Sequence, residues 1–339
     1  MKKTDFAQCL ETYLRIYLPG QAGLSENTIM AYRDTFIQIL RFTENTKKKS
    51  PDKLTLSDFN VLFIEEFLGW LETENHNSIS TRNQRLAAIR AFVKYAHSRY
   101  PEFMLEAQKI SDIRVKKRPK PELAHLTPDE IKAILDSVPT DNRYGRRDLA
   151  LLALLYDSAA RVQELCDLRV RDVRLQKPYT VKLVGKGHKA RCVPVMDNTV
   201  DILMKYVTEN HLNVTEKASN PFFFNHMNTA LTRAGVAYIL KKYCDMARRS
   251  APGLPKMISP HVLRHSKAMH MLQANMPLTD IRDFLGHEHV DTTEIYAKTD
   301  TEMRRKKLEE SQISIDKKLP DWNSDKNLMA ILMNLCGKS

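Results

Sequence analysis

The sequence predicts a mainly helical chain of two domains with one small β-hairpin or sheet. Only 10 of its 339 residues are glycine, and long stretches place apolar residues at the spacing of a helix that packs on one face. One segment, "YTVKLVGKGHKARCVPV" (Tyr179–Val195), instead alternates polar and apolar residues on both sides of a glycine-bearing turn. That pattern is typical of a β-hairpin. A chain of 339 residues is long enough for about two domains.

The composition favours an anionic polymer as partner. Lys and Arg outnumber Asp and Glu by 53 to 41, which gives a net charge of +12. Such a surplus suits nucleic acid, although an unspecialised basic surface would carry it too. With 42% hydrophobic and 28% charged residues, we expect a soluble chain with ordinary packed cores. The most apolar run, "LALLALLYDSAA" (Leu149–Ala160), is too short to span a bilayer and predicts a buried helix.

The cysteines and the first residues predict a cytoplasmic protein without a membrane partner. The five cysteines are scattered, odd in number and without a CxxC pair, so neither a disulfide framework nor a zinc ribbon is indicated. Reduced thiols fit this pattern best. Asp5, Gln8 and Glu11 interrupt the stretch that would be apolar in a signal peptide.

Residues 1–111 predict a small helical domain. Phe6, Leu10 and Tyr13 begin one apolar stripe, and Ser25 is a plausible N-cap for the helix that follows. A later helix, "SISTRNQRLAAIRAFVKYAHSRY", carries basic residues at positions expected to face outward. These are Arg82, Arg85, Arg90 and Lys94. They either contact DNA phosphates or form an ordinary solvated face.

Residues 112–126 predict a basic linker. The stretch holds two prolines and lacks hydrophobic periodicity. Four of its cations are candidates for contact with DNA phosphates, although they could also be merely solvated. The four candidates are Lys116, Lys117, Arg118 and Lys120. The next helix opens with Thr127 as N-cap, Pro128 in the first turn and Glu130 completing a capping box. A second domain over 127–312 is therefore expected to start there.

The tail, residues 313–339, is polar and ends in a short amphipathic segment. Leu328, Ile331, Leu332 and Leu335 share one face of a helix there. An apolar stripe indicates burial but not against what. The helix docks either on its own chain or on a neighbouring subunit.

The second domain contains the residue types that phosphodiester cleavage without a metal needs. Such cleavage takes a nucleophile, a cationic clamp on the non-bridging oxygens, and a proton donor for the leaving oxygen. Arginine suits the clamp because its planar fork grips phosphate bidentately. A tyrosine serves as nucleophile when nearby cations stabilise its phenolate.

Several short motifs supply these types. Arg161 follows the apolar helix, and Glu164 lies one turn later, where it is placed to hold the guanidinium. Lys186 sits at the glycine-flanked hairpin tip. His261 and Arg264 share one helical face in "PHVLRH". Taken singly, each is also explained as a solvated helix end, turn or face.

The histidines raise the question of a metal. His261 and His265 have i, i+4 spacing, and His287 and His289 follow in "LGHEHVDTTEIYAK". However, Val262 stands where an HExxH motif needs glutamate, and suitably spaced carboxylate or cysteine ligands are missing. We therefore expect neither metal nor other cofactor, and interpret His265 as a packed structural residue.

Taken in order, these motifs resemble those of the phage-integrase-type tyrosine recombinases. The matching stretches are "LLYDSAARVQEL", "LVGKGHKARCVPV", "LTRAGVAYILKKY", "SPHVLRHSKAMHML" and "LGHEHVDTTEIYAK". A weaker match, "LSENTIMAYRDTFIQILRF" with "STRNQRLAAIRAFVKYA", is similar to the family's N-terminal DNA-clamp domain. The resemblance thus implies a helical clamp domain followed by a tyrosine-recombinase catalytic domain.

The resemblance also implies roles for single residues. Tyr296 would be the nucleophile that forms a 3′-phosphotyrosyl bond, and Lys186 would protonate the leaving 5′-oxygen. Arg161 and Arg264 would hold the scissile phosphate. His261 would assist proton transfer, and His287 would orient the phosphate. The partners implied are double-stranded DNA with specific recombination sites and three further copies of the chain in a homo-tetramer.

One residue departs from the family pattern. Many members have glycine two residues before the first arginine of the site, whereas this chain has Ala159 in "SAAR". If the position needs a positive φ, alanine is strained there.

Two other functions fit part of the pattern. A type IB topoisomerase-like enzyme shares this chemistry, and the clamp-domain match and the tail helix favour a recombinase over it. A catalytically inert DNA-binding accessory protein is the other alternative, against which the complete set of site residues argues.

Overall fold

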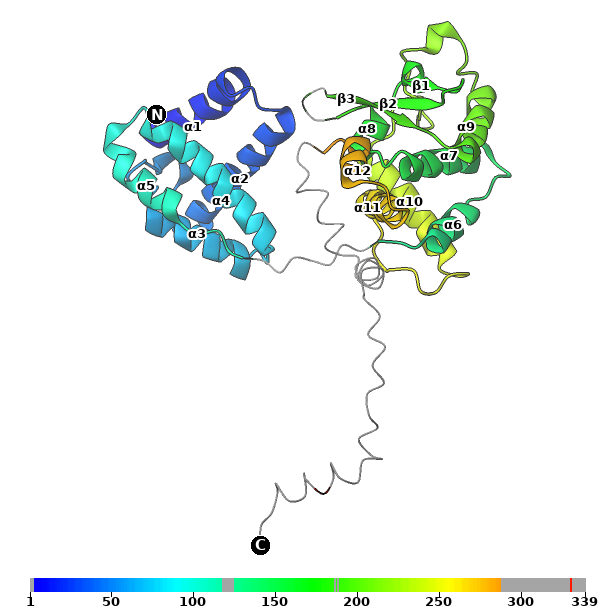
Figure 1. The fold of residues 1–339 in the computed structure, drawn as a ribbon. Coiled ribbons are helices and arrows are strands. Elements are labelled where there is room, and N and C mark those ends of the chain that lie inside the picture. Colours follow the sequence, from blue (N-terminus) through cyan, green and yellow to red (C-terminus); the bar gives the residue numbers. More distant parts are fainter. Residues whose placement is uncertain (1–2, 118–124, 186, 188, 288–329, 331–339) are drawn as a thin grey trace. The chain divides into compact units, whose positions relative to one another are not determined.

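The computed structural model describes residues 3–117, 125–185, 187, 189–287 and 330. The chain forms two compact units, residues 1–121 and 122–339. The division falls inside the stretch 112–126 that was expected to be a linker. The prediction of a mainly helical fold with a small sheet is confirmed (Figure 1).

The N-terminal unit is built of helices around an aromatic core. Phe6, Tyr13, Phe36 and Phe92 are almost fully buried, and most of their rings meet edge to face. The apolar stripes of the sequence therefore mark this core correctly. The elements are α1 (Asp5–Thr12), the π-helical η1 (Tyr13–Gln21), α2 (Glu26–Asn45), η2 (Pro51–Lys53), α3 (Val61–Thr73), α4 (Ile79–His97), η3 (Pro101–Phe103) and α5 (Met104–Asp112).

The C-terminal unit packs helices against a three-stranded antiparallel sheet of order β1-β2-β3. Strands β2 and β3 form the predicted hairpin, with Lys182 opposite Cys192. Strand β1 was not predicted, because its two residues are too few to alternate. The elements are α6 (Pro128–Asp136), α7 (Arg143–Asp157), α8 (Val162–Cys166), η4 (Val170–Asp172), β1 (Val173–Arg174), β2 (Thr180–Val184), β3 (Ala190–Pro194), α9 (Asp197–Glu209), η6 (Thr215–Lys217), α10 (Arg233–Ala247), α11 (Pro260–Gln273) and α12 (Leu278–Leu285).

Helix α7 is the centre of this unit. Leu151, Leu154 and Leu155 are inaccessible to solvent and pack in one cluster with residues of the sheet, α9, α10 and α11. The apolar run in the sequence is thus a buried helix, as expected. Figure 1 shows α8, α12 and the β2–β3 hairpin gathered at one end of the unit.

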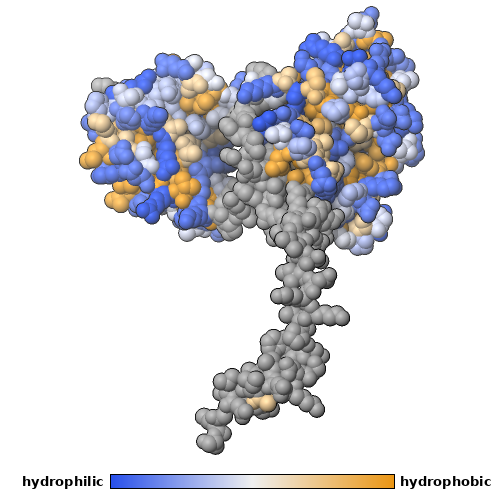
Figure 2. Space-filling view, in the orientation of Figure 1, coloured by the Kyte–Doolittle hydropathy of each residue, from blue (hydrophilic) through white to orange (hydrophobic). Residues whose placement is uncertain are grey.

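The surfaces are mixed in polarity. Figure 2 shows hydrophilic residues interspersed with small hydrophobic patches on the visible face of each unit. Within the described part of the chain, none of the helices has the length and hydropathy that a membrane span requires.

Two predicted N-caps behave differently. Thr127 accepts a hydrogen bond from the Glu130 backbone N–H at 3.2 Å, and the Glu130 carboxylate accepts one from the Thr127 N–H at 2.7 Å. The predicted capping box is therefore present. Ser25 precedes α2 as predicted, but its hydroxyl pairs with that of Thr28 rather than with a backbone N–H.

This difference predicts unequal costs of removing the two hydroxyls. Thr127→Ala should lower the free energy of unfolding by about 1 kcal/mol. The Glu130 N–H loses its acceptor, and the reciprocal hydrogen bond from the Thr127 N–H to the Glu130 carboxylate is weakened. Ser25→Ala, the matched control, should change it by less than about 0.5 kcal/mol. Urea denaturation followed by circular dichroism measures both. Equal losses in the two variants would contradict this account of the caps.

Candidate active site

Arg161 and Arg264 meet at the C-terminal end of α12. Nη2 of Arg161 donates to the carbonyl oxygen of Gly286 at 3.1 Å, and Nη2 of Arg264 donates to that of Leu285 at 2.6 Å. Two arginines that are 103 positions apart in the sequence thus bond consecutive peptide groups. The arrangement brings together the two guanidinium groups that the sequence singled out.

Arg161 is held by Glu164, as its spacing predicted. The backbone N–H of Arg161 donates to Oε2 of Glu164 at 2.8 Å, and its Nη1 donates to Oε1 at 2.8 Å. The Arg161 side chain is 35% exposed, whereas that of Glu164 is 3% exposed. The carboxylate therefore fixes the guanidinium from below and leaves its outer edge accessible.

Arg191, on β3, is a site residue that sequence reasoning missed. Its Nη1 and Nη2 donate to Oε1 and Oε2 of Glu164 at 2.9 and 2.8 Å, and its Nε donates to the Phe284 carbonyl at 2.9 Å. A signal was present. Arg191 pairs with buried Leu183 and is two residues from buried Val193, so the alternation of the hairpin places an arginine on the inward face.

The two arginines determine the charge of Glu164. Burial alone would raise the pKa of this carboxyl, but hydrogen bonds from Arg191 and from the Arg161 backbone outweigh it and lower the pKa to about 2. Glu164 is thus ionised at neutral pH. Because its pKa is depressed, the stability it contributes is complete above the ordinary pKa of 4.5 and is lost as the pH falls toward 2.

His287 lies half-buried beside the same arginines. Burial, followed by the positive charges of Arg264, Arg161 and Arg191, lowers its pKa to about 4. The imidazole is therefore neutral at physiological pH and has one N–H to donate. A phosphate bound here would add negative charge and favour the imidazolium form.

Two residues with positive φ shape the site. Gly286 has φ +65°, and a Cβ at this position would lie 3.0 Å from both Cδ and Nη1 of Arg191. Glycine is therefore required both by the backbone and by the close approach of Arg191. Ala159 has φ +45° and is fully buried, so the strain expected of alanine at this position is present. Its carbonyl accepts a hydrogen bond from Nη1 of Arg264 at 2.5 Å.

A cavity of about 340 Å³ lies over these groups. One water occupies about 30 Å³ of liquid, so the space holds a group much larger than a water molecule. The residues that line it are Arg161, Gly185, Lys189, Ala190, Arg191, Gly286 and His287. Its wall is thus cationic and is formed by α8, the hairpin and the end of α12.

The other residues predicted for the site lie in different surroundings. His261 is exposed at the start of α11, one turn before Arg264. His265 is half-buried, and burial with the nearby charges of His261 and Arg264 lowers its pKa. Lys186 and Tyr296 lie outside the described residues, as does His289. Among the residues that are described, no three His, Cys, Asp or Glu side chains are placed to share a metal ion.

The predicted DNA contacts on α4 include one correction. Arg82 was expected on the outer face but is buried, since only 6% of it is exposed. Its Nη1 donates to the Arg114 carbonyl, because α4 is covered there by residues 113–116. Arg90 likewise donates to the Ile113 carbonyl. Arg85 is half-buried and donates to the Ala31 carbonyl.

The remaining predicted contacts are more accessible or lie outside the description. Lys94, Lys116 and Lys117 are exposed, and the Lys116 ammonium pairs with Glu72. Arg118 and Lys120 lie outside the described residues. The binding of DNA by any of these side chains stays a prediction.

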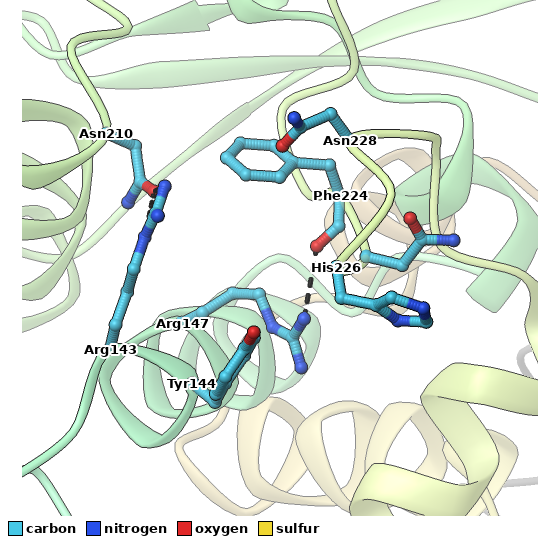
Figure 3. A pocket seen from close by; sticks show the side chains of 8 residues that line it. Arg143, Tyr144, Arg147, Asn210, Phe224, His226 and Asn228 are labelled. Carbon is cyan, nitrogen blue, oxygen red and sulfur yellow. Dashed lines mark hydrogen bonds between the residues drawn. The ribbon is translucent and has the colours of Figure 1, made fainter.

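A second hollow with two arginines lies at the opposite end of α7 (Figure 3). Arg143 donates from Nε and Nη2 to Oδ1 of Asn210, and Arg147 donates to the Phe224 carbonyl and to Asp148. These bonds fasten α9 and the loop at Phe224 to α7. The catalytic residues expected from the sequence do not line this hollow, so we give it a packing role.

Comparisons with known proteins identify the family of this chain. The phage integrase family matches residues 124–303, and the phage integrase N-terminal SAM-like domain matches residues 10–100. Tyrosine recombinase XerD of Listeria monocytogenes is 31% identical over 296 residues, which cover 85% of this chain and 92% of XerD. The chain therefore belongs to the phage integrase family, the tyrosine recombinases.

Solved structures share the fold. The integrase of the Tn1549 transposon, in complex with transposon right end DNA, has a TM-score of 0.66 at 17% identity, covering 89% of this chain and 98% of that one. The XerH site-specific recombinase, in a pre-cleavage complex with difH substrate, has a TM-score of 0.63 at 21% identity, covering 84% and 79%. Both are similar in fold to this chain.

The strain at residue 159 leads to a stability prediction. Ala159→Val should lower the free energy of unfolding by about 2 kcal/mol or more, because a β-branched residue is disfavoured at positive φ and the position is buried. Ala159→Gly should stay within about 1 kcal/mol of the natural protein, since relief of strain offsets the loss of a buried methyl. Urea denaturation measures both values. An Ala159→Val variant with an unchanged free energy of unfolding would contradict the positive φ at residue 159.

The burial and surroundings of His287 lead to a titration prediction. In the free protein its imidazole should stay neutral until the pH falls to about 4. Added inorganic phosphate should raise this pKa, because an anion favours the imidazolium form. Arg161→Gln should raise it as well by removing a nearby positive charge. Proton–nitrogen NMR of the ring follows the titration, and a midpoint near the ordinary 6.5 would refute the placement.

Proposed function

We propose that this protein is a site-specific DNA recombinase that cleaves and rejoins DNA strands through a 3′-phosphotyrosyl intermediate. The observation that carries the proposal is the meeting of Arg161 and Arg264 on the carbonyls of Gly286 and Leu285, beside His287. Two guanidinium groups and a neutral imidazole at one cationic cavity suit a single backbone phosphate. Family membership adds the chemistry of a tyrosine nucleophile.

In the proposed cleavage, the phenol oxygen of Tyr296 attacks phosphorus, and the bond from phosphorus to the 5′-oxygen breaks. Arg161 and Arg264 hold the non-bridging oxygens, which gain negative charge in the transition state. His261 takes the phenol proton, and Lys186 gives a proton to the leaving 5′-oxygen. His287 donates a hydrogen bond to the phosphate.

Rejoining is the same sequence in reverse with a different strand. The phosphotyrosyl bond keeps the energy of the broken linkage, so neither ATP nor a metal ion enters the proposed reaction. A 5′-hydroxyl of a partner strand attacks the phosphotyrosine and releases Tyr296. Two such exchanges pass through a Holliday junction, which needs four copies of the chain on paired sites.

The proposed partner is double-stranded DNA with specific recombination sites. The relatives named above include an integrase and a recombinase solved with DNA. The net charge of +12 supports salt-sensitive phosphate binding by both units. Lys94 and Lys117 are accessible for such contacts, whereas Arg82 is occupied within its own unit. The tail helix, outside the described residues, is proposed to pack on a neighbouring subunit.

A recombinase is favoured over a nicking and closing enzyme of the topoisomerase type. The catalytic residues fit both. The match of residues 10–100 to the N-terminal domain of phage integrases and the recombinase relatives over most of the chain support strand exchange.

Replacement of the nucleophile tests the proposal. Tyr296→Phe should keep DNA binding but form no covalent adduct on a nicked suicide duplex, because the phenol oxygen is removed. Tyr238→Phe is a matched control on the exposed face of α10 and should form the adduct at the natural rate. Adducts are counted by denaturing gel electrophoresis with labelled DNA. An adduct with Tyr296→Phe would show that another residue is the nucleophile.

A further inference from the structure

We infer that Arg191 is a positioning residue that saturates Glu164 and thereby leaves the charge of Arg161 available to the scissile phosphate. The inference rests on the proposed function and adds to it a residue outside the predicted catalytic set. Arg191 acts through its neighbours and is not required to touch DNA.

Arg191 and Arg161 together hold the Glu164 carboxylate. Both Glu164 oxygens accept from Arg191 in a two-pronged pair, and each also accepts one bond from Arg161. The Arg191 side chain is 12% exposed and that of Glu164 is 3% exposed. A planar fork held at three nitrogens is one of the more rigid contacts available to a side chain. The Glu164 carboxylate is therefore held in one orientation. Because the Arg161 guanidinium donates to this carboxylate, its orientation is fixed as well.

Arg191 also sets the net charge of the site. Arg161 and Glu164 alone would form a neutral pair, and a neutral pair attracts phosphate weakly. With Arg191 the three groups carry a net charge of +1, and with Arg264 the four carry +2. Attack of a phenolate on a phosphodiester gathers two negative charges at phosphorus. These four side chains match that charge only because Arg191 is present.

Arg191 also contacts the end of α12. Nε of Arg191 donates to the Phe284 carbonyl, and its Cδ lies where a side chain at Gly286 would clash. The next two carbonyls, of Leu285 and Gly286, hold Arg264 and Arg161. One side chain thus steadies both clamp arginines, one through Glu164 and the other through the turn that ends α12.

A purely structural role for Arg191 makes a different prediction from a role in charge balance. A structural defect lowers cleavage of every substrate by a similar factor. A defect in charge balance depends on the charge of the reacting group. It also diminishes when the unbalanced carboxylate is removed.

The experiment compares Arg191→Met with the double variant Arg191→Met/Glu164→Gln. On a nicked suicide duplex, Arg191→Met should slow adduct formation by about 100-fold, a loss typical of one charge-stabilising group. The double variant restores the net charge of +2 and should regain about tenfold. Arg191→Lys keeps the charge but not the fork, and its rate should lie between those of Arg191→Met and the natural protein.

A second substrate separates charge from structure. A duplex with a neutral methylphosphonate at the scissile position lacks one negative charge, so Arg191→Met should slow its cleavage by less than about tenfold. Lys182→Met, an exposed charge loss on the same hairpin, should affect both substrates equally. Circular dichroism melting of each variant shows whether the fold is retained.

The outcomes are distinct for the two proposals. If the natural protein forms no adduct on the phosphodiester, the proposed function fails and the inference fails with it. If the natural protein forms the adduct and Arg191→Met slows both substrates alike, with no recovery in the double variant, the inference alone is overturned.

Discussion

The candidate active site depends on one buried carboxylate, that of Glu164, which is shared by two guanidinium groups. Glu164 is ionised because its carboxylate accepts four hydrogen bonds. Two come from the Arg191 guanidinium, one from the Arg161 guanidinium and one from the Arg161 backbone N–H. An unpaired carboxylate at this depth would be strongly disfavoured. The interaction joins α8 to β3, and through the Phe284 carbonyl it joins both to α12. Loss of either partner would therefore disturb three elements at once.

Backbone carbonyls hold the clamp arginines, and two of these carbonyls belong to residues with positive φ. Ala159 presents its oxygen to Arg264, and Gly286 presents its oxygen to Arg161. The left-handed conformation turns a peptide group away from the direction of the preceding helix, which aims the carbonyl at a side chain. At Ala159 the site retains this geometry without glycine, so local strain is tolerated where it fixes a functional group.

Much of the fold could be predicted from local pattern. The apolar run of α7, the alternation of the hairpin and the capping box at Thr127 depend on neighbours within a few residues, and the structure has all three. Strand β1 was missed because two residues carry no period. Arg82 was misplaced because the helical period of α4 marks a face as outer without indicating that residues 113–116 cover it.

The sequence by itself determined the residue types of the site and the order in which they occur, since arginine, glutamate and histidine carry their chemistry wherever they stand. Only the tertiary structure decided which of them meet. Arg161, Arg191, Arg264 and the end of α12 come together through contacts between residues far apart in the chain. The inward-facing Arg191 has a partner only because α8 places the Glu164 carboxylate within hydrogen-bond distance of it. Periodicity reports which side of an element is buried, whereas the partner on that side is set by packing.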